Sequence, residues 1–295
     1  MAYTEERAYL ELHLAVFLWG FTAILGDLIQ LSALTLVWWR VLLTSLSLIF
    51  FVRIHRVIDE LGWRRFGLLA GIGVIVALHW VTFYGAIKLA NASIALICMA
   101  TTSLFSSLLE PLIVGRPFRW FELLLGLFIL PGIWLVVDGV DTAMNIGIGV
   151  GLLSAALVSV FTSLNKKYIG SSNPQRITFI ELGAATLFLT PFLIPFGGEH
   201  FWPAPLDWFY LLVLSLLCTT LTFFLSLRSL SKLSAFASNL TVNLEPVYGI
   251  FLAYFLLDDA QELSPTFYWG ALLIMASVFG YTAVMRQLRR RQLLT

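Results

Sequence analysis

The sequence predicts an all-α integral membrane protein with ten transmembrane helices, and three observations support this fold class. The first is composition: 59% of the 295 residues are hydrophobic and 12% are charged, against about 45–50% and 25% in a typical soluble domain. The second is a mean hydropathy of +0.90, which leaves too few charged side chains to cover a soluble core. The third is a succession of apolar runs of about twenty residues, the length that crosses a bilayer.

The candidate spans are the apolar stretches between polar breaks. Because these stretches are continuously apolar and do not alternate with period two, they favour helices over the strands of a barrel. In chain order they cover residues 10–31, 33–53, 65–87, 90–114, 120–137, 147–165, 177–196, 206–227, 233–257 and 266–285.

The distribution of Lys and Arg predicts the orientation. Sixteen of the 18 basic residues fall in the two ends and in alternate loops, whereas the loops around Asp27, 138–141, 199–207 and 258–262 contain none. By the positive-inside rule the basic loops are cytoplasmic. Both termini are therefore predicted to be cytoplasmic, which requires an even number of spans.

The chain also carries a weak internal repeat. Phe21-Thr22-Ala23 aligns with Phe161-Thr162-Ser163, and Gly126-Leu127 aligns with Gly270-Ala271, in each case about 140 residues further along. Each half then holds five spans, and an odd number of spans forces the second copy to enter the membrane upside down. We expect two inverted five-helix repeats, residues 1–142 and 143–295, an arrangement that recurs in secondary transporters.

This layout resembles the EamA-type members of the drug/metabolite transporter superfamily over almost the whole chain. The motifs that carry the resemblance are Leu18-Trp19-Gly20, Arg40, Gly85-Ala86-Ile87-Lys88, Ala90-Asn91-Ala92-Ser93 and Asn243-Leu244-Glu245-Pro246. The chain departs from the family pattern at Ser103, where a proline is common, and at Gly115-Arg116, where a Gly-Glu pair is common. The resemblance implies transport of small metabolites and does not name the metabolite.

Ionisable residues inside apolar spans are the first candidates for a site, because each costs about 2.5–3.5 kcal/mol on insertion scales. Glu245 lies near the middle of the predicted span 233–257, beside Pro246. It is predicted to bind a substrate amine or to carry a coupled proton; a carboxyl bonded to a neighbouring helix is the alternative. Asn239 and Asn243 precede it, four residues apart and on one helical face.

Arg40 is a second candidate, in the outer part of the span 33–53. Its guanidinium is suited to hold a carboxylate or a phosphate with two hydrogen bonds, but an ion pair between helices or a snorkelling side chain remains open. Glu181 is its counterpart in the repeat and is interpreted as structural. Ser103 belongs to the polar surface Thr101-Thr102-Ser103, which either lines a cavity or lets helices pack closely.

His79 and Tyr84 form a third candidate group in the outer half of the span 65–87. The histidine is able to bind substrate or relay a proton, and a single structural hydrogen bond is the alternative.

The leading hypothesis is a secondary transporter, an exporter or exchanger, that moves an amino acid or related amphipathic solute by alternating access near Glu245 and Ser103. The alternative is an intramembrane enzyme or lipid-handling protein that uses Glu245 and His79 as acid and base. No metal cluster or nucleotide-binding motif occurs in the sequence, so no cofactor, metal or nucleic acid is expected. We expect a small-molecule substrate, contact with membrane lipids, a proton as an optional coupling ion, a monomer or homodimer, and a place in a bacterial inner membrane.

Overall fold

The computed structural model describes residues 3–52, 57–127, 129–138, 140–169, 173–198, 200–242, 244–257, 264–273 and 275–276. Within these ranges the regular structure is helical and no strand occurs, which confirms the all-α prediction for the described chain. The number of membrane crossings and the side on which the termini lie stay predictions.

The helices of the first half are α1 (Glu5–Leu28), α2 (Ala33–Ile49), α3 (Val57–Leu89), α4 (Ala92–Met99), α5 (Thr102–Val114), α6 (Trp120–Leu127) and α7 (Leu130–Asp138). The second half contains α8 (Asn145–Tyr168), α9 (Pro174–Phe196), α10 (Pro205–Ser215), α11 (Thr222–Leu230), α12 (Ala235–Val242) and α13 (Glu245–Leu256). A 3-10 turn covers Thr142–Met144, and residues 265–273 are helical.

Side-chain caps explain where several of these helices begin. In each, a Ser, Thr or Asn oxygen accepts a hydrogen bond from a backbone N–H of the first turn, which would otherwise have no partner. The capping residues are Thr4 for α1, Ser32 for α2, Asn91 for α4 and Asn173 for α9.

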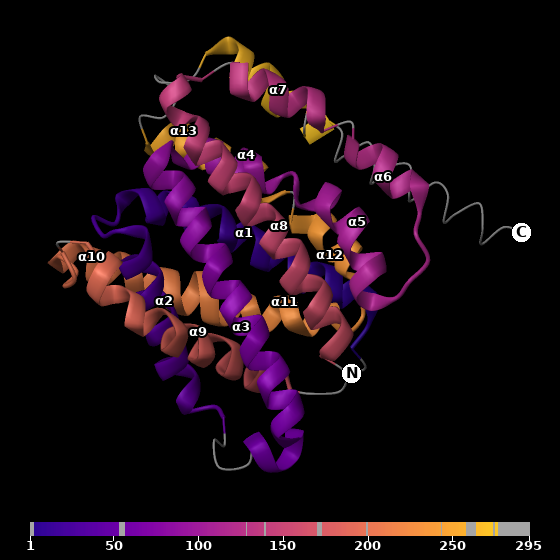
Figure 1. The fold of residues 1–295 in the computed structure, drawn as a ribbon, viewed down its shortest axis with the longest axis vertical. Coiled ribbons are helices and arrows are strands. Elements are labelled where there is room, and N and C mark those ends of the chain that lie inside the picture. The colour runs from indigo at the N-terminus through magenta and orange to yellow at the C-terminus, as the bar shows by residue number, and fades with distance from the viewer. Residues whose placement is uncertain are drawn as a thin grey trace, which may run out of the picture.

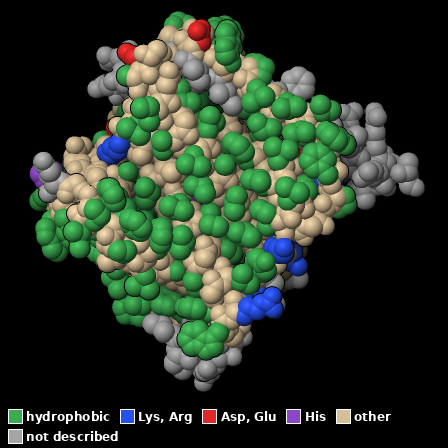
Figure 2. Space-filling view, in the orientation of Figure 1, with side chains coloured by type: hydrophobic (Ala, Val, Ile, Leu, Met, Phe, Trp, Pro, Cys, Tyr) green, Lys and Arg blue, Asp and Glu red, His purple; other side chains and the backbone are tan. Residues whose placement is uncertain are grey.

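The surface and the helix lengths are those of a multi-pass membrane protein. Figure 2 shows hydrophobic side chains spread over the visible face. The few charged side chains on this face lie toward its edges. Six helical stretches of the described chain are long and apolar enough to cross a membrane: Glu5–Leu28, Leu61–Leu89, Ala92–Val114, Thr142–Tyr168, Pro174–Phe196 and Pro205–Leu230. Ala33–Ile49 and Glu245–Leu256 are shorter apolar helices.

Several predicted spans are not the uninterrupted helices that the sequence suggested. The span 120–137 covers α6 and α7, and the span 206–227 contains a π-helical segment between α10 and α11. Two further spans are divided near the centre of the molecule. The span 90–114 is divided into α4 and α5, because the hydroxyls of Thr101 and Thr102 donate to the carbonyls of Cys98 and Met99 and tighten the chain between them. The span 233–257 is divided into α12 and α13, because Pro246 has no N–H to donate to the helix.

The two divided spans meet each other, since α4 packs against α13 and α5 packs against α12. The remaining helices also pair across the halves: α1 contacts α11 and α13, α2 contacts α9, and α3 contacts α8 and α9. In Figure 1, α6 and α7 lie at one edge of this bundle, close to the yellow C-terminal helical segment. The centre of the molecule is therefore built from residues of both halves.

Close approach between α1 and α13 depends on a glycine. A Cβ atom on Gly20 would lie 2.9 Å from the Cβ of Tyr248, so only glycine leaves room for this crossing. This crossing places the first turn of α13, which contains Glu245, beside α1.

Candidate functional site

A cavity lies between helices α1–α4 of the first half and helices α8, α11, α12 and α13 of the second half. The space between its lining atoms is about 720 Å³, including the open solvent at its mouth. Its aromatic walls are Trp19, Trp80, Phe83, Phe161 and Phe223, and its polar lining consists of Thr22, Arg40, His79, Thr162, Asn165, Ser226, Ser238 and Glu245.

Arg40 brings a positive charge to this cavity and is 2% exposed. Its Nε donates to Thr219 Oγ1 at 2.7 Å and its Nη1 donates to the Tyr84 hydroxyl at 2.8 Å, while Nη2 approaches the Cys218 carbonyl at 3.5 Å. Its guanidinium lies 3.9 Å from the centroid of the Trp80 ring. A guanidinium has five N–H groups, so each terminal nitrogen keeps one donor beyond these contacts.

The neighbours of Arg40 come from an irregular stretch that the sequence did not predict. Leu216–Leu221 forms a π-helical segment between α10 and α11. Such a segment disturbs the regular backbone pairing and is frequent at functional sites. It turns the Thr219 hydroxyl and the Cys218 carbonyl toward α2, and the pair Thr219-Thr220 in an otherwise apolar run was the available signal.

Glu245 brings a carboxylate to the same cavity from the first turn of α13 and is 6% exposed. Within the described chain, no group donates a hydrogen bond to this carboxylate and no basic side chain forms an ion pair with it. Arg40 is close enough to interact with it electrostatically. The cavity therefore presents a basic and an acidic side chain that form no ion pair with each other.

His79 lines the cavity from α3 and is held by Ser154 of α8. The Ser154 hydroxyl donates to the His79 carbonyl at 3.0 Å, and His79 Nδ1 lies 2.8 Å from the same Ser154 Oγ. Because the single hydroxyl proton is already donated, Nδ1 is the donor of the second bond. The ring also packs 5.5 Å from the Phe161 ring.

The structure brings together three of the predicted site residues, Arg40, His79 and Glu245, on one cavity. Tyr84 is not part of the lining but holds Arg40, and Ser103 is buried on α5 away from the lining. Asn243 and the side chain of Asn239 lie outside the described residues. Sequence reasoning did not single out Trp19, Asn165, Ser226 and Ser238 as site residues. Two of them gave a signal: Trp19 stands in the motif Leu18-Trp19-Gly20, and Asn165 is a polar residue near the end of an apolar run.

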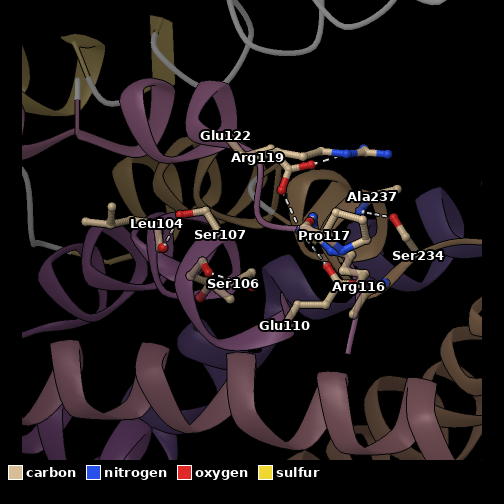
Figure 3. A network of polar contacts seen from close by, with 12 residues as sticks. Leu104, Ser106, Ser107, Glu110, Arg116, Pro117, Arg119, Glu122, Ser234 and Ala237 are labelled. Atoms are coloured by element: carbon tan, nitrogen blue, oxygen red, sulfur yellow. Dashed lines mark hydrogen bonds and ion pairs between the residues drawn. The ribbon is translucent and has the colours of Figure 1, made fainter. Parts of the chain in front are cut away.

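A second polar cluster lies away from the cavity, where α5 ends and α6 begins (Figure 3). Arg116 forms ion pairs with both Glu110 and Glu122, and Arg119 pairs with Glu122 at 3.3 Å. The other oxygen of Glu110 accepts a hydrogen bond from the backbone N–H of Ala235, where α12 starts. The hydrogen bond from Ala235 connects the first half to the second, and together with the ion pair to Arg116 it gives both oxygens of Glu110 a partner.

These features define a class: a multi-pass helical membrane protein with a central cavity that carries buried ionisable groups from both halves. The model of the EamA-like transporter family matches residues 7–138 and again residues 145–283. The chain therefore belongs to the EamA-like transporter family, which confirms the resemblance seen in the sequence.

Among solved structures, the crystal structure of another protein aligns over 97% of this chain and 99% of its own, with a TM-score of 0.68 and 17% sequence identity. At this identity the similarity concerns the fold. A search of curated proteins gave no significant match.

Proposed function

We propose that the chain is a secondary transporter that moves a small zwitterionic solute, such as an amino acid with an apolar side chain, by alternating access. In this proposal Arg40 binds the substrate carboxylate, Glu245 binds the substrate ammonium group, and the aromatic walls of the cavity enclose the apolar side chain. The surrounding membrane is proposed to be a bacterial inner membrane, with both termini in the cytoplasm and ten spans in two inverted repeats.

The observation that carries the proposal is that a basic and an acidic side chain, Arg40 and Glu245, line one cavity and form no ion pair with each other. A buried charge without a partner costs several kcal/mol, and both Arg40 and Glu245 are almost fully buried. A zwitterionic substrate supplies both side chains with a group of opposite charge: its carboxylate for Arg40 and its ammonium group for Glu245. The two N–H groups left on the terminal nitrogens of Arg40 match the two oxygens of a carboxylate.

The rest of the lining supports an apolar substrate side chain. Trp19, Phe83, Phe161 and Phe223 add aromatic surface without further charge. Burial of an apolar group contributes about 25 cal/mol per Å². This surface favours phenylalanine or leucine over amino acids with charged side chains.

The participation of both halves supports alternating access. Arg40 and His79 come from the first half, whereas Asn165 and Glu245 come from the second. Divided helices at the point where two repeats meet are typical of transporters that rock one repeat against the other. A movement between the halves would then open and close the site.

A thermal-shift experiment on detergent-purified protein tests the substrate class. The probes are L-phenylalanine, phenethylamine, which lacks the carboxylate, and 3-phenylpropanoate, which lacks the amine. We expect L-phenylalanine alone to raise the unfolding midpoint clearly, because a ligand that binds only the folded state stabilises it. Glu245→Gln should lose this shift, and Glu6→Gln, an exposed glutamate at the start of α1, should keep it.

Uptake of labelled L-phenylalanine into proteoliposomes then tests transport. Saturable uptake that is absent in Glu245→Gln supports the proposal. If lipids shift the midpoint and no zwitterion does, or if the purified protein converts the probe chemically, the lipid-handling or enzymatic alternative replaces the transporter.

A further inference from the structure

Behind the cavity wall lies a second buried carboxyl, Glu181 on α9, which the substrate site does not use. The residue is 0% exposed and does not line the cavity. Its Oε2 accepts a long hydrogen bond, 3.4 Å, from Nδ2 of Asn165 on α8. Asn165 does line the cavity, so this amide is the link between Glu181 and the substrate space.

This contact leaves two oxygens without a hydrogen-bond donor. Glu181 Oε1 and Asn165 Oδ1 are both buried and unpartnered. An ionised carboxylate with one long hydrogen bond and no cation is costly in such surroundings. A protonated carboxyl has one O–H to donate, and half a turn of the Asn165 amide brings its Oδ1 to face that proton. Protonation thus removes the buried charge and gives the amide oxygen a donor.

Charged groups on the helices around α9 are engaged elsewhere. Arg40 of α2 bonds to Thr219 and Tyr84, and His79 of α3 bonds to Ser154. The other basic groups of α3, α8 and α11 bond as follows: Arg65 to the carbonyls of Tyr168 and Ile169, Lys88 to that of Ile29, Lys166 to those of Leu230 and Leu233, Lys167 to that of Ile113, and Arg228 to Glu11. Arg64 is exposed. Arg176, on α9 itself, has contacts of its own, and no described basic side chain forms a hydrogen bond or an ion pair with Glu181.

We propose that Glu181 is the proton-binding site of a proton–substrate antiporter, and that Asn165 transmits substrate binding to it. This inference rests on the proposed transport function and adds the coupling ion and the sense of coupling. Glu245 is assigned a different role, because it lines the cavity itself and is the proposed site of the substrate ammonium group.

The proton balance follows from the single amide of Asn165. Without substrate, the carboxyl O–H of Glu181 donates to Asn165 Oδ1. A substrate N–H that enters the cavity donates to the same Oδ1, so the amide turns and presents Nδ2 to Glu181. The proton of Glu181 leaves past the turning Asn165 amide, which separates Glu181 from the cavity, and passes to water in the cavity. The carboxylate then accepts the N–H bond from Nδ2. One proton is released for each substrate bound, and the reverse exchange occurs on the other side of the membrane.

The first test measures proton release from purified protein in weakly buffered detergent solution, with a pH indicator and L-phenylalanine as the probe. We expect the wild type to release about one proton per bound probe. Since coupling is reciprocal, its affinity for the probe should rise with pH by up to about tenfold per unit. Glu181→Gln should bind the probe with no proton release and with an affinity that does not depend on pH.

The second test separates coupling from transport in proteoliposomes. We expect Glu181→Gln to keep the exchange of labelled for unlabelled L-phenylalanine and to lose accumulation driven by a pH gradient. Asn165→Leu removes the link by a change of similar size. Because Asn165 also lines the cavity, we expect this variant to bind the probe more weakly, with no proton release and with an affinity that does not depend on pH, and it serves if Glu181→Gln does not fold. Glu245→Gln should lose both activities.

Each outcome decides one of the two proposals. Proton release or gradient-driven accumulation that persists in a folded Glu181→Gln or Asn165→Leu variant overturns the role of Glu181. Accumulation driven by sodium and not by protons also overturns it. If the wild type neither binds nor exchanges L-phenylalanine or L-leucine, the proposed function itself fails.

Discussion

At the scale of single residues, Arg40 connects the fold to the site. Its contacts to Thr219 and Tyr84 join α2 to α3 and to the π-helical segment, and its remaining N–H groups are available to the cavity. A planar guanidinium is able to stack on Trp80 and donate in several directions at once, whereas an ammonium group is a point charge. The side chain therefore holds helices together and serves as the proposed anion site.

Replacing Arg40 with lysine keeps the positive charge and removes the planar guanidinium, so it tests how much the geometry of the guanidinium contributes to substrate binding. We expect Arg40→Lys to weaken the affinity for L-phenylalanine at least about tenfold, or about 1.4 kcal/mol, since the two-pronged contact is lost. It should also lower the free energy of unfolding by about 1–3 kcal/mol, because buried partners lose their donor. Thermal shifts and titrations measure both effects, with Arg119→Lys, outside the cavity, as the control. Unchanged affinity in Arg40→Lys would remove Arg40 from the site.

The surroundings of Tyr3 predict that the protein loses stability at alkaline pH. Its hydroxyl donates to Glu11 Oε2 at 2.9 Å, and burial, followed by this bond and the charge of Glu11, raises the pKa of Tyr3 above its ordinary value. Because the folded-state pKa is raised, the stabilisation is present below the unfolded value of about 10 and is lost as the pH rises above it.

We expect Tyr3→Phe to lower the free energy of unfolding by about 1 kcal/mol at pH 8 and by less at pH 11. The test compares the unfolding midpoints of the wild type and Tyr3→Phe at both pH values. The other tyrosines are the same in the two proteins, so their titration cancels in the difference between the two midpoints. A difference that grows at high pH would contradict the assignment.

At the scale of helices, the contact between α3 and α9 fixes the position of Glu181. A Cβ atom on Gly73 of α3 would overlap the Glu181 carbonyl oxygen, so the two backbones touch. Glycine is the residue that permits this approach within a helix. The contact places the Glu181 side chain within reach of Asn165 on α8.

Gly73→Ala should therefore be destabilising, by about 1–3 kcal/mol as for other overpacked sites. Gly71→Ala is the matched control, because no atom lies within 4 Å of its added Cβ. The control should be neutral or stabilising by up to about 1 kcal/mol, since alanine favours helix more than glycine does. Unfolding midpoints in detergent measure both, and equal effects would show that the α3–α9 contact is looser than described.

At the scale of the whole molecule, the two ends of the cavity differ. Its lining includes Asn165, Leu230 and Ser238, which lie where α8 and α11 end and α12 begins, on the predicted cytoplasmic side. On the opposite side, Trp39 packs against Phe201 and Trp208 and donates to the Phe201 carbonyl at 2.9 Å, while the Gln30 N–H donates to Asp207. These contacts join the two halves on the predicted outer side.

A cysteine at Ser226 should report this asymmetry. We expect a membrane-impermeant maleimide to label Ser226→Cys in inside-out vesicles and not in intact cells, and L-phenylalanine to protect it. The native Cys98 and Cys218 are both 2% exposed and should not react. Thr142→Cys, exposed on a predicted outer loop, is the control for access from the other side. Labelling of Ser226→Cys from outside alone would reverse the predicted orientation.

The sequence by itself determined the all-α class, the membrane environment and the family, because hydropathy, the spacing of basic loops and short motifs are local properties of the chain. It also pointed to Arg40, His79 and Glu245, since an ionisable residue inside an apolar run stands out by the cost of its insertion. Their roles as binding residues stay predictions.

Only the tertiary structure decided which of these groups meet and what surrounds them. The division of spans 90–114 and 233–257, the π-helical segment that presents Thr219, and the Asn165–Glu181 contact depend on how helices cross and how far each is rotated about its axis. Such crossings are set by packing between residues far apart in the chain, at glycines such as Gly20 and Gly73. Hydropathy shows how apolar each helix is. Which side chains share a cavity depends on the contacts between helices, and these are seen only in the tertiary structure.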